Sequence, residues 1–322
     1  MGHPCHLLIA LVGAGLLGCA AAADGGAPLH SQAGSAGVAQ LAGSGGAWNA
    51  GGSESSSGTL SVIVTDPPAG AGAPPSDDCS DASKLVYVAS DENDLYSFAP
   101  DKLTFTKLGR LACPSQTVNS MAVDRSGTAW VNYDDGKIYK VEIKSLHCTA
   151  TSYVPAQGRF TKVLGMGFAA DAPGSANETL FVADNRGKGI GKVDLATMTL
   201  TPLGAYTGEL AGSNAELTGT GDARLFGFFT TSPAHFAAID KATGQTPTAT
   251  LLPTVDASSG GYAFSFWGGD FWFYTANDTP TTSVTHYVSA DGTASVVLSD
   301  IGFVIVGAGV STCAPTVPPV VK

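Results

Sequence analysis

The chain has 322 residues and a formal charge of −11, from 16 basic and 27 acidic side chains. The acidic balance argues against nucleic acid as a partner, because binding phosphates needs clustered Lys and Arg. The 44% apolar content argues against a wholly disordered chain. With 41 glycines and few charges, the composition favours an exported all-β protein.

The amino terminus has the pattern of an export signal. Residues 7–17 are an apolar stretch that is too short for a membrane helix and has the length of a signal-peptide core. The tetrapeptide Leu-Leu-Gly-Cys at 16–19 resembles a bacterial lipobox, in which the Cys is acylated. We expect a lipoprotein signal peptide over 1–19 with lipidation at Cys19; a plain secretory signal cleaved just after it is the alternative. Because Ala20 and not Asp follows the Cys, the resemblance implies an exported outer-membrane lipoprotein, periplasmic or on the cell surface.

Residues 20–78 are rich in Gly, Ala, Ser and Pro and contain no Lys or Arg. Such a segment cannot bury enough apolar surface to offset its ordering entropy, so we predict a disordered tether. A folded domain is expected over 79–313, followed by a Pro-rich tail over 314–322.

The domain contains an internal repeat. Four units each hold four short β-rich runs, separated by turns such as Asp134-Asp-Gly136 and Ala290-Asp-Gly292. The runs lie at 120–124, 127–131, 137–141 and 148–153; at 165–168, 179–183, 190–194 and 200–203; at 215–219, 224–228, 236–240 and 246–252; and at 262–267, 270–274, 284–287 and 294–298. Four antiparallel strands repeated about every 45 residues are typical of β-propeller blades.

The two ends of the domain complete a fifth unit. Runs at 85–89, 95–98 and 105–108 match the second, third and fourth strands of a blade, and the run at 305–310 matches a first strand. We therefore predict an all-β, five-bladed β-propeller of four-stranded antiparallel blades, closed by the C-terminal strand completing the N-terminal blade. Closure removes exposed sheet edges.

Four cysteines lie in the predicted domain. Cys79 precedes the first N-terminal run and Cys313 follows the closing strand, so a disulfide between them would replace the missing hairpin turn. Cys113 and Cys148 then pair by elimination. The expected strand register puts these two near opposite ends of neighbouring blades, and free buried thiols are the alternative.

The stretch Met121-Ala-Val-Asp-Arg-Ser-Gly-Thr-Ala-Trp-Val131 carries a family resemblance. Its strand, Asp-x-x-Gly turn and second strand resemble NHL repeats and the propeller repeats of streptogramin lyases. Together with the lipobox and the tether, the domain resembles bacterial β-propeller lipoproteins, a resemblance that implies no activity. Streptogramin lyases use a His and a Glu on the central face, and no repeat position here matches that pair.

The loops that join second and third strands share one face with the crossovers between blades, and loops on a rigid scaffold carry function. Candidate binding residues in these loops are Asp91, Asn93, Asp134, Asp184, Asn185, Arg186, His235 and Asn277. These residue types are also good turn formers, which is the structural alternative. The acids Asp124, Glu216 and Asp222, at the ends of first strands, are candidates for a glycosidase acid pair, but the sequence places no two of them together.

No HExxH, CxxC or GxSxG motif is present. We predict no metal site and no cofactor, and the sequence identifies no catalytic residue. The leading functional hypothesis is a recognition module that binds a polar ligand, such as a glycan or small molecule, or an envelope protein. Membrane contact is expected only through the lipid anchor. The alternatives are a propeller enzyme, a lyase or glycoside hydrolase acting on a polysaccharide, and a passive scaffold.

Overall fold

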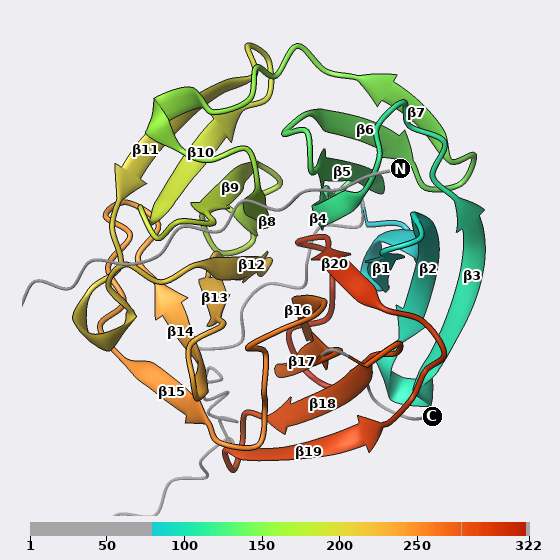
Figure 1. The fold of residues 1–322 in the computed structure, drawn as a ribbon, viewed down its shortest axis with the longest axis vertical. Helices are drawn as coiled ribbons and strands as arrows, with labels where there is room; N and C mark the ends of the chain where they lie inside the picture. The colour runs from blue at the N-terminus through green and yellow to red at the C-terminus, as the bar shows by residue number, and fades with distance from the viewer. Residues whose placement is uncertain (1–78, 278, 320–322) are drawn as a thin grey trace, which may run out of the picture. The chain divides into compact units, whose positions relative to one another are not determined.

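The predicted β-rich runs form strands in a computed structural model of the chain, which describes residues 79–277 and 279–319. Cys19 and the predicted tether lie outside the described residues. Within them, the strands assemble into five antiparallel sheets of four strands each, arranged as blades around a central axis (Figure 1). The five-bladed β-propeller is therefore confirmed.

We number the blades in chain order and give each from its inner strand outward. Blade 1 is β20 (Ile305–Val310), β1 (Val86–Ser90), β2 (Asp94–Ala99) and β3 (Thr104–Arg110). Blade 2 is β4 (Val118–Val123), β5 (Thr128–Tyr133), β6 (Ile138–Glu142) and β7 (His147–Ala150). Blade 3 is β8 (Leu164–Ala170), β9 (Glu178–Asp184), β10 (Ile190–Asp194) and β11 (Thr199–Gly204). Blade 4 is β12 (Ala215–Gly219), β13 (Leu225–Phe229), β14 (Ala234–Ile239) and β15 (Ala249–Leu252). Blade 5 is β16 (Tyr262–Trp267), β17 (Asp270–Thr275), β18 (Ser283–Val288) and β19 (Thr293–Leu298). Short 3-10 turns lie at Ala82–Lys84 (η1), Pro100–Lys102 (η2), Gln157–Arg159 (η3) and Gly208–Leu210 (η4).

Local chemistry explains where strands end. In the turn between β4 and β5, Asp124 Oδ1 accepts hydrogen bonds from the backbone amides of Ser126 (3.0 Å) and Thr128 (2.9 Å). Gly127 in the same turn has φ +81°, a left-handed conformation that a glycine adopts without strain. The Asp-x-x-Gly pattern therefore reverses the chain and sets the register of the hairpin.

Ring closure follows the prediction. The last strand, β20, pairs antiparallel with β1, with Val310 opposite Val86. Cys79 and Cys313 form a disulfide with Cα atoms 5.6 Å apart, across a sequence separation of 234. The first and last described segments are therefore joined both by a strand ladder and by a covalent bond.

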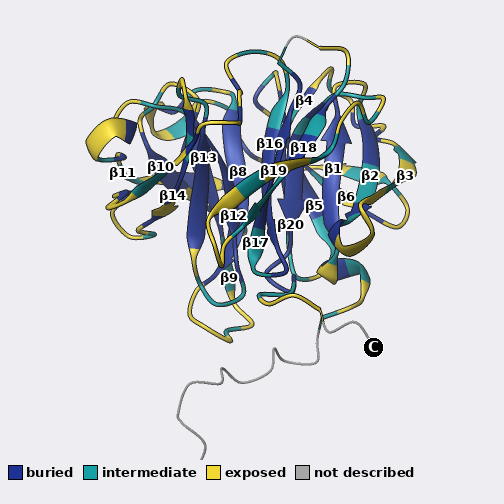
Figure 2. Ribbon diagram, turned by 90° about the horizontal axis from the view of Figure 1, so that it is seen from below, coloured by how far each residue is buried: buried dark blue, intermediate teal, exposed yellow. Residues whose placement is uncertain are grey.

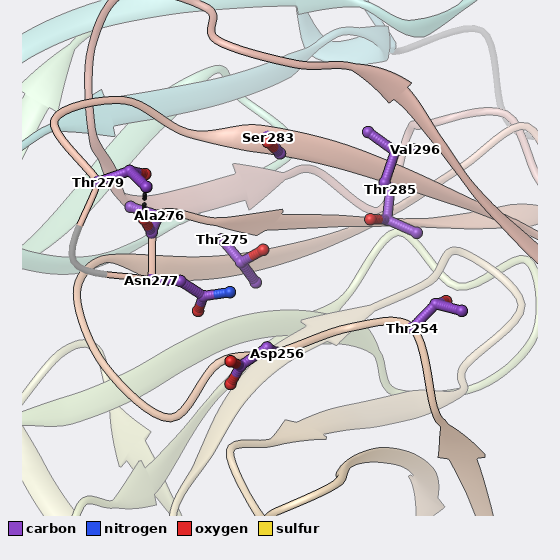
Figure 3. Close-up of a pocket in the computed structure, with 9 residues that line it drawn as sticks. All are labelled: Thr254, Asp256, Thr275, Ala276, Asn277, Thr279, Ser283, Thr285 and Val296. Atoms are coloured by element: carbon purple, nitrogen blue, oxygen red, sulfur yellow. Dashed lines mark hydrogen bonds between the residues drawn. The ribbon is translucent and has the colours of Figure 1, made fainter.

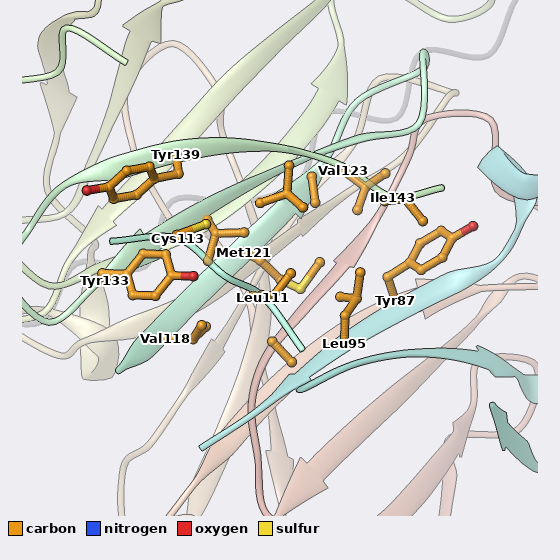
Figure 4. Close-up of a cluster of buried hydrophobic side chains, with 14 residues drawn as sticks. Tyr87, Leu95, Leu111, Cys113, Val118, Met121, Val123, Tyr133, Tyr139 and Ile143 are labelled. Atoms are coloured by element: carbon orange, nitrogen blue, oxygen red, sulfur yellow. The ribbon is translucent and has the colours of Figure 1, made fainter. Parts of the chain in front are cut away.

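Apolar side chains fill the spaces between blades, so that the buried residues follow the strands and the exposed residues the loops (Figure 2). Between blades 1 and 2, Leu95 and Met121 are fully buried in a cluster that also contains Tyr133 and Tyr139 (Figure 4). Between blades 4 and 5, Phe228 and Phe273 meet with ring centroids 4.9 Å apart. Burial of this aromatic surface stabilises the ring at every blade contact.

The second disulfide joins Cys113 to Cys148, with Cα atoms 5.2 Å apart. The expected register, which put these residues at opposite ends of neighbouring blades, was wrong for the outer strands. Strand twist accumulates from the inner to the outer strand of a blade, so the outermost strands lie along the rim, and the end of β3 reaches the start of β7 (Figure 1). Both cysteines are therefore oxidised rather than free.

In the described part of the chain, no helix is long and apolar enough to cross a membrane.

Candidate functional site

We call the face that carries the second-to-third strand loops and the blade crossovers the loop face. The chain topology puts seven of the eight candidate residues at the ends of strands or in loops on this face, in one group on each of blades 1, 2, 3 and 5. Asp91 and Asn93 lie between β1 and β2, Asp134 between β5 and β6, Asp184 to Arg186 at the end of β9, and Asn277 after β17. The exception is His235, which was expected in a loop and lies within β14.

His235 is held by its own blade. Its Nδ1 is 2.8 Å from Thr231 Oγ1 and 3.1 Å from the carbonyl oxygen of Pro233. Its Nε2 lies 3.6 Å from a carboxylate oxygen of Glu209. The peptide bond between Ser232 and Pro233 is cis, and β14 starts at Ala234, one residue before the histidine.

Two of the candidates are bonded within the scaffold. Asn93 donates to the carbonyl oxygen of Gln116 (2.5 Å) and accepts from the amide of Val118 (2.9 Å), which ties blade 1 to the first strand of blade 2. Asp184 is fully buried, and its Oδ2 accepts from the amides of Arg186 (3.0 Å) and Lys188 (3.2 Å). Asp184 therefore stabilises its own turn, whereas Asn93 joins two neighbouring blades.

The remaining polar side chains of the loops differ in their surroundings. Asp91 and Arg186 are exposed, and Asp134 is exposed with its Oδ1 3.5 Å from the amide of Thr117. Asn185 Oδ1 lies 3.4 Å from Asn214 Nδ2. Among the described residues, no hydrogen bond or ion pair joins a candidate residue of one blade to a candidate residue of another.

Asn277 lines a pocket of about 200 Å³ on the loop face (Figure 3). Thr275, Ser283 and Thr285 of blade 5 form one wall, and Asp256 of the crossover from blade 4 faces them. The described residues of the lining are Thr254, Asp256, Thr275, Ala276, Asn277, Thr279, Ser283, Thr285 and Val296. Seven of these nine side chains carry a hydroxyl, an amide or a carboxylate, so the pocket offers mainly hydrogen-bonding groups.

The Asn277 side chain is the unusual member of this lining. Its backbone is left-handed, with φ +41°, and its Oδ1 is buried without a hydrogen-bond partner among the described residues. A buried acceptor without a donor costs about 1–3 kcal/mol. Thr279 Oγ1, by contrast, donates to the carbonyl oxygens of Ala276 and Thr281, the latter at 2.6 Å.

The charge of the pocket comes from Asp256. Hydrogen bonds from the side chain and the backbone amide of Ser258 hold the pKa of the Asp256 carboxyl below its usual range, so this group is ionised at neutral pH. The described residues that line the pocket include no Lys, Arg or His. The lining therefore favours a ligand that donates hydrogen bonds and is neutral or cationic.

A second polar group lies on the inner strands. Glu216 of β12 is 5% exposed, and burial raises the pKa of its carboxyl to about 8. The sequence suggests Glu216 only as half of an acid pair. The structure pairs it with Ser120, whose hydroxyl is 2.7 Å from Glu216 Oε2. The sequence signal for this buried carboxyl is a single Glu in β12, an inner strand whose other residues are uncharged.

Among the described residues, no three His, Cys, Asp or Glu side chains come together in a group that could hold a metal ion.

No protein-family model matches the chain. No curated protein matches it either. Among solved structures, it is similar to a chain of the "Crystal Structure of Mitotic Checkpoint Complex", with 12% identity and a TM-score of 0.39 over 68% of this chain and 62% of that one. It is also similar to the extracellular domain of a putative one component system from B. thetaiotaomicron, with 12% identity and a TM-score of 0.35 over 69% of this chain and 27% of that one. The chain thus spans less than two thirds of either structure, and the assignment of the fold rests on its own strand topology.

Proposed function

We propose that this β-propeller is an exported recognition module that binds a small polyhydroxylated ligand, such as one sugar unit of a glycan, in the loop-face pocket around Asn277. The observation that carries the proposal is the buried Oδ1 of Asn277, which has no hydrogen-bond partner among residues 79–277 and 279–319, in a pocket lined by hydroxyls. A ligand hydroxyl or ammonium that donates to this oxygen removes the cost of leaving it unpaired.

The size and charge of the pocket support a small donor ligand. At about 200 Å³ it is smaller than the roughly 300–1,000 Å³ of pockets for drug-sized ligands. The ionised Asp256 disfavours phosphorylated and acidic sugars, because like charges repel at short distance. An amino sugar satisfies both groups, with its ammonium near Asp256 and a hydroxyl near Asn277.

Binding is favoured over catalysis by the same lining. Its side chains are mostly hydroxyl and amide groups, which orient a ligand and are weak acids and bases. Hydrolysis of a glycosidic bond uses two carboxyl groups on either side of the bond, and among the described residues of this lining Asp256 is the one carboxylate.

The two disulfides are typical of proteins that fold in an oxidising compartment, which supports export. We further propose that acylated Cys19 anchors the protein to the outer membrane. A tagged protein produced in a Gram-negative host with labelled palmitate should incorporate the label, and the Cys19→Ala variant should not. Equal labelling of the two would exclude the anchor.

Calorimetric titration of the purified protein with glucosamine, glucose and glucose 6-phosphate tests the ligand proposal. We expect affinity in that order. Asn277→Ala should weaken glucosamine binding about tenfold, the equivalent of one hydrogen bond to a buried group. Asn185→Ala, on the loop face but outside the pocket, is the matched control. Tightest binding of the phosphorylated sugar, or equal binding by both variants, would contradict the proposal.

A further inference from the structure

A cationic patch lies on the loop face at blade 3, which contributes no described residue to the pocket around Asn277. Arg159 lies in the crossover from blade 2, and Arg186 and Lys188 lie in the loop between β9 and β10. We call these three exposed residues the basic patch. Acidic residues outnumber basic ones by 27 to 16 in the whole chain, so the patch is a local departure from the charge of the protein.

The side chain of Asp184 fixes the two segments of the patch against each other. Its Oδ1 accepts a hydrogen bond from the amide of Thr161 in the crossover at 2.5 Å. Its Oδ2 accepts from the amides of Arg186 and Lys188. Lys188 Nζ donates in turn to the carbonyl oxygen of Arg159. Because Asp184 is fully buried and bound to backbone amides, it positions the segments that carry the three cations.

The two arginines of the patch present free hydrogen-bond donors. Among residues 79–277 and 279–319, neither guanidinium group donates a hydrogen bond or forms an ion pair, whereas Arg224 elsewhere pairs with Asp222 at 2.9 Å. A guanidinium group carries five N–H donors in a fork that matches the oxygens of a carboxylate or a phosphate. The patch therefore offers two such forks and one ammonium group to an anionic ligand.

The backbone holds Arg159 in an unusual conformation. Its φ is +66°, in the left-handed region that favours glycine, and it follows Gly158 with φ +60°. Gln157, at the start of this turn, is tied to blade 3 by hydrogen bonds with Met198 (2.9 Å) and Leu200 (3.0 Å). The fold thus places a long cationic side chain at a turn position where glycine would cost less free energy.

Lys162 belongs to the same crossover but not to the patch. A Cβ on Gly136 would lie 2.8 Å from the Cβ of Lys162. Lys162 therefore adjoins the turn between β5 and β6, which carries Asp134 and Asp135. These two acids reduce the attraction of an anion to Lys162, so we confine the patch to the three residues of the η3 turn and the β9–β10 loop.

We propose that the basic patch binds an anionic polysaccharide through the carboxylate or phosphate groups of its sugars. The complementary charge of two free guanidinium forks and an ammonium group carries the proposal. The patch is separate from the pocket around Asn277, so this inference does not rest on the amino-sugar proposal.

The residues around the patch favour a polysaccharide over a bilayer or a folded protein. The exposed residues of 156–162 and 185–188 are Ala, Gly, Asn, Arg and Lys, with no large apolar side chain. Insertion into a bilayer and the centre of a protein interface both need apolar or aromatic side chains. Val154, just before this segment, is a single exposed apolar residue of the kind that is ordinary on protein surfaces.

The net negative charge of the chain does not prevent this binding at physiological salt. The Debye length is about 8 Å at 0.15 M ionic strength, so distant acids of the protein are screened from the ligand. Contacts between a guanidinium fork and an anionic group are much shorter than this length and are screened less. Binding should therefore be local to the patch.

Calorimetric titration of the full chain in about 0.15 M salt tests the patch, with polygalacturonate and phosphorylated dextran as probes and unmodified dextran as the neutral control. We expect at least one anionic probe to bind and unmodified dextran not to bind. The triple variant Arg159→Gln, Arg186→Gln, Lys188→Gln should weaken that binding at least about tenfold, because it removes all three cations. The matched control, Lys102→Gln, Arg110→Gln, Lys144→Gln, removes the same charge from exposed residues of blades 1 and 2 and should stay within about twofold of the wild type.

Patch-dependent binding of one anionic probe identifies whether carboxylates or phosphates are bound. Equal losses in the two triple variants would assign the binding to bulk charge and overturn the proposal. Absence of binding to both anionic probes, or tighter patch-dependent binding to phosphatidylglycerol vesicles, would also overturn it. The single variant Arg186→Gln, which removes no side-chain hydrogen bond of the described residues, should still weaken binding if the triple variant does not fold. Asn277→Ala should leave binding to the anionic probes unchanged, so failure of the patch and failure of the pocket are distinguishable.

Discussion

Glu178 and Thr312, 134 residues apart in the chain, are joined by a 2.7 Å hydrogen bond in which Thr312 Oγ1 donates to Glu178 Oε2. The other carboxylate oxygen of Glu178 accepts from the backbone amide of Arg125 at 2.8 Å. Thr312 precedes Cys313 of the closing disulfide. One largely buried carboxyl therefore links the turn after β4, the start of β9 and the segment that closes the ring.

Stability should depend on the protonation of Glu178. Burial raises the pKa of its carboxyl from 4.5 to about 7, although hydrogen bonds from Arg125 and Thr312 act in the opposite direction. The folded state then binds the proton more tightly than the unfolded state. The resulting stabilisation is fully present below about pH 4.5 and is lost as pH rises through about 7, by at most about 3 kcal/mol.

Glu178→Gln should remove this contribution, so that its stability changes less than that of the wild type between pH 5 and pH 8. Urea unfolding at several pH values measures the free energy of unfolding directly. Asp222→Asn is a useful comparison, because hydrogen bonds from Arg224 and Thr220 lower the pKa of the Asp222 carboxyl. A parallel pH dependence for the wild type and Glu178→Gln would disprove the assignment.

The closing disulfide should contribute more to stability than the internal one. Cys79–Cys313 constrains a separation of 234 residues and Cys113–Cys148 one of 35. In the chain-entropy description these are worth about 5 and about 4 kcal/mol, since longer loops lose more unfolded-state entropy. We expect the Cys79→Ser, Cys313→Ser double variant to have the lower Tm of the two disulfide-free proteins. A lower Tm for the Cys113→Ser, Cys148→Ser variant would mean that the strand ladder between β20 and β1 closes the ring by itself.

Gly165 should not tolerate a side chain. A Cβ at this position would overlap the carbonyl oxygen of Ala215 on the inner strand of blade 4. Gly165→Ala should therefore destabilise the protein by about 1–3 kcal/mol, the usual cost of overpacking. Gly174→Ala, whose Cβ meets no atom within 4 Å but whose φ is +73°, isolates the cost of losing glycine's backbone freedom. Equal loss of Tm in the two variants would show that β8 can shift away from β12.

Two asparagines in equivalent loops should respond in opposite ways to the same change. Asn93 and Asn277 both have left-handed backbones, with φ +65° and +41°. Asn93→Gly removes two hydrogen bonds and should cost about 1–3 kcal/mol. Asn277→Gly removes an acceptor that has no partner in the described part of the chain. It should leave the free energy of unfolding within about 0.5 kcal/mol of the wild type, or raise it, because glycine adopts this conformation freely.

The same Asn277→Gly variant should lose most of its affinity for glucosamine. A residue that is needed for binding but not for stability is typical of a functional site. Chemical denaturation and calorimetric titration of both variants check this. A large loss of stability in Asn277→Gly would assign Asn277 a structural role instead.

Much of the fold was predictable because its determinants are local. Alternating apolar residues and Asp-x-x-Gly turns mark each strand and hairpin, and the run at 305–310 coincides with β20. A blade that lacks its first strand at one end of the domain, and an unpaired strand at the other, predicted both the closure and the Cys79–Cys313 disulfide. These features depend on chain order, which a sequence displays directly.

Only the tertiary structure decided the features that depend on distances across blades. The accumulated twist of four strands brought Cys113 to Cys148. The space above Gly165 let Glu216 reach Ser120. In the loops, the same residue type took different roles: Asn93 found two partners in its neighbouring crossover, whereas Asn277 faces a pocket. The sequence identifies a side chain that can form hydrogen bonds, but the packing of the folded chain determines which hydrogen-bond partners the protein provides for it.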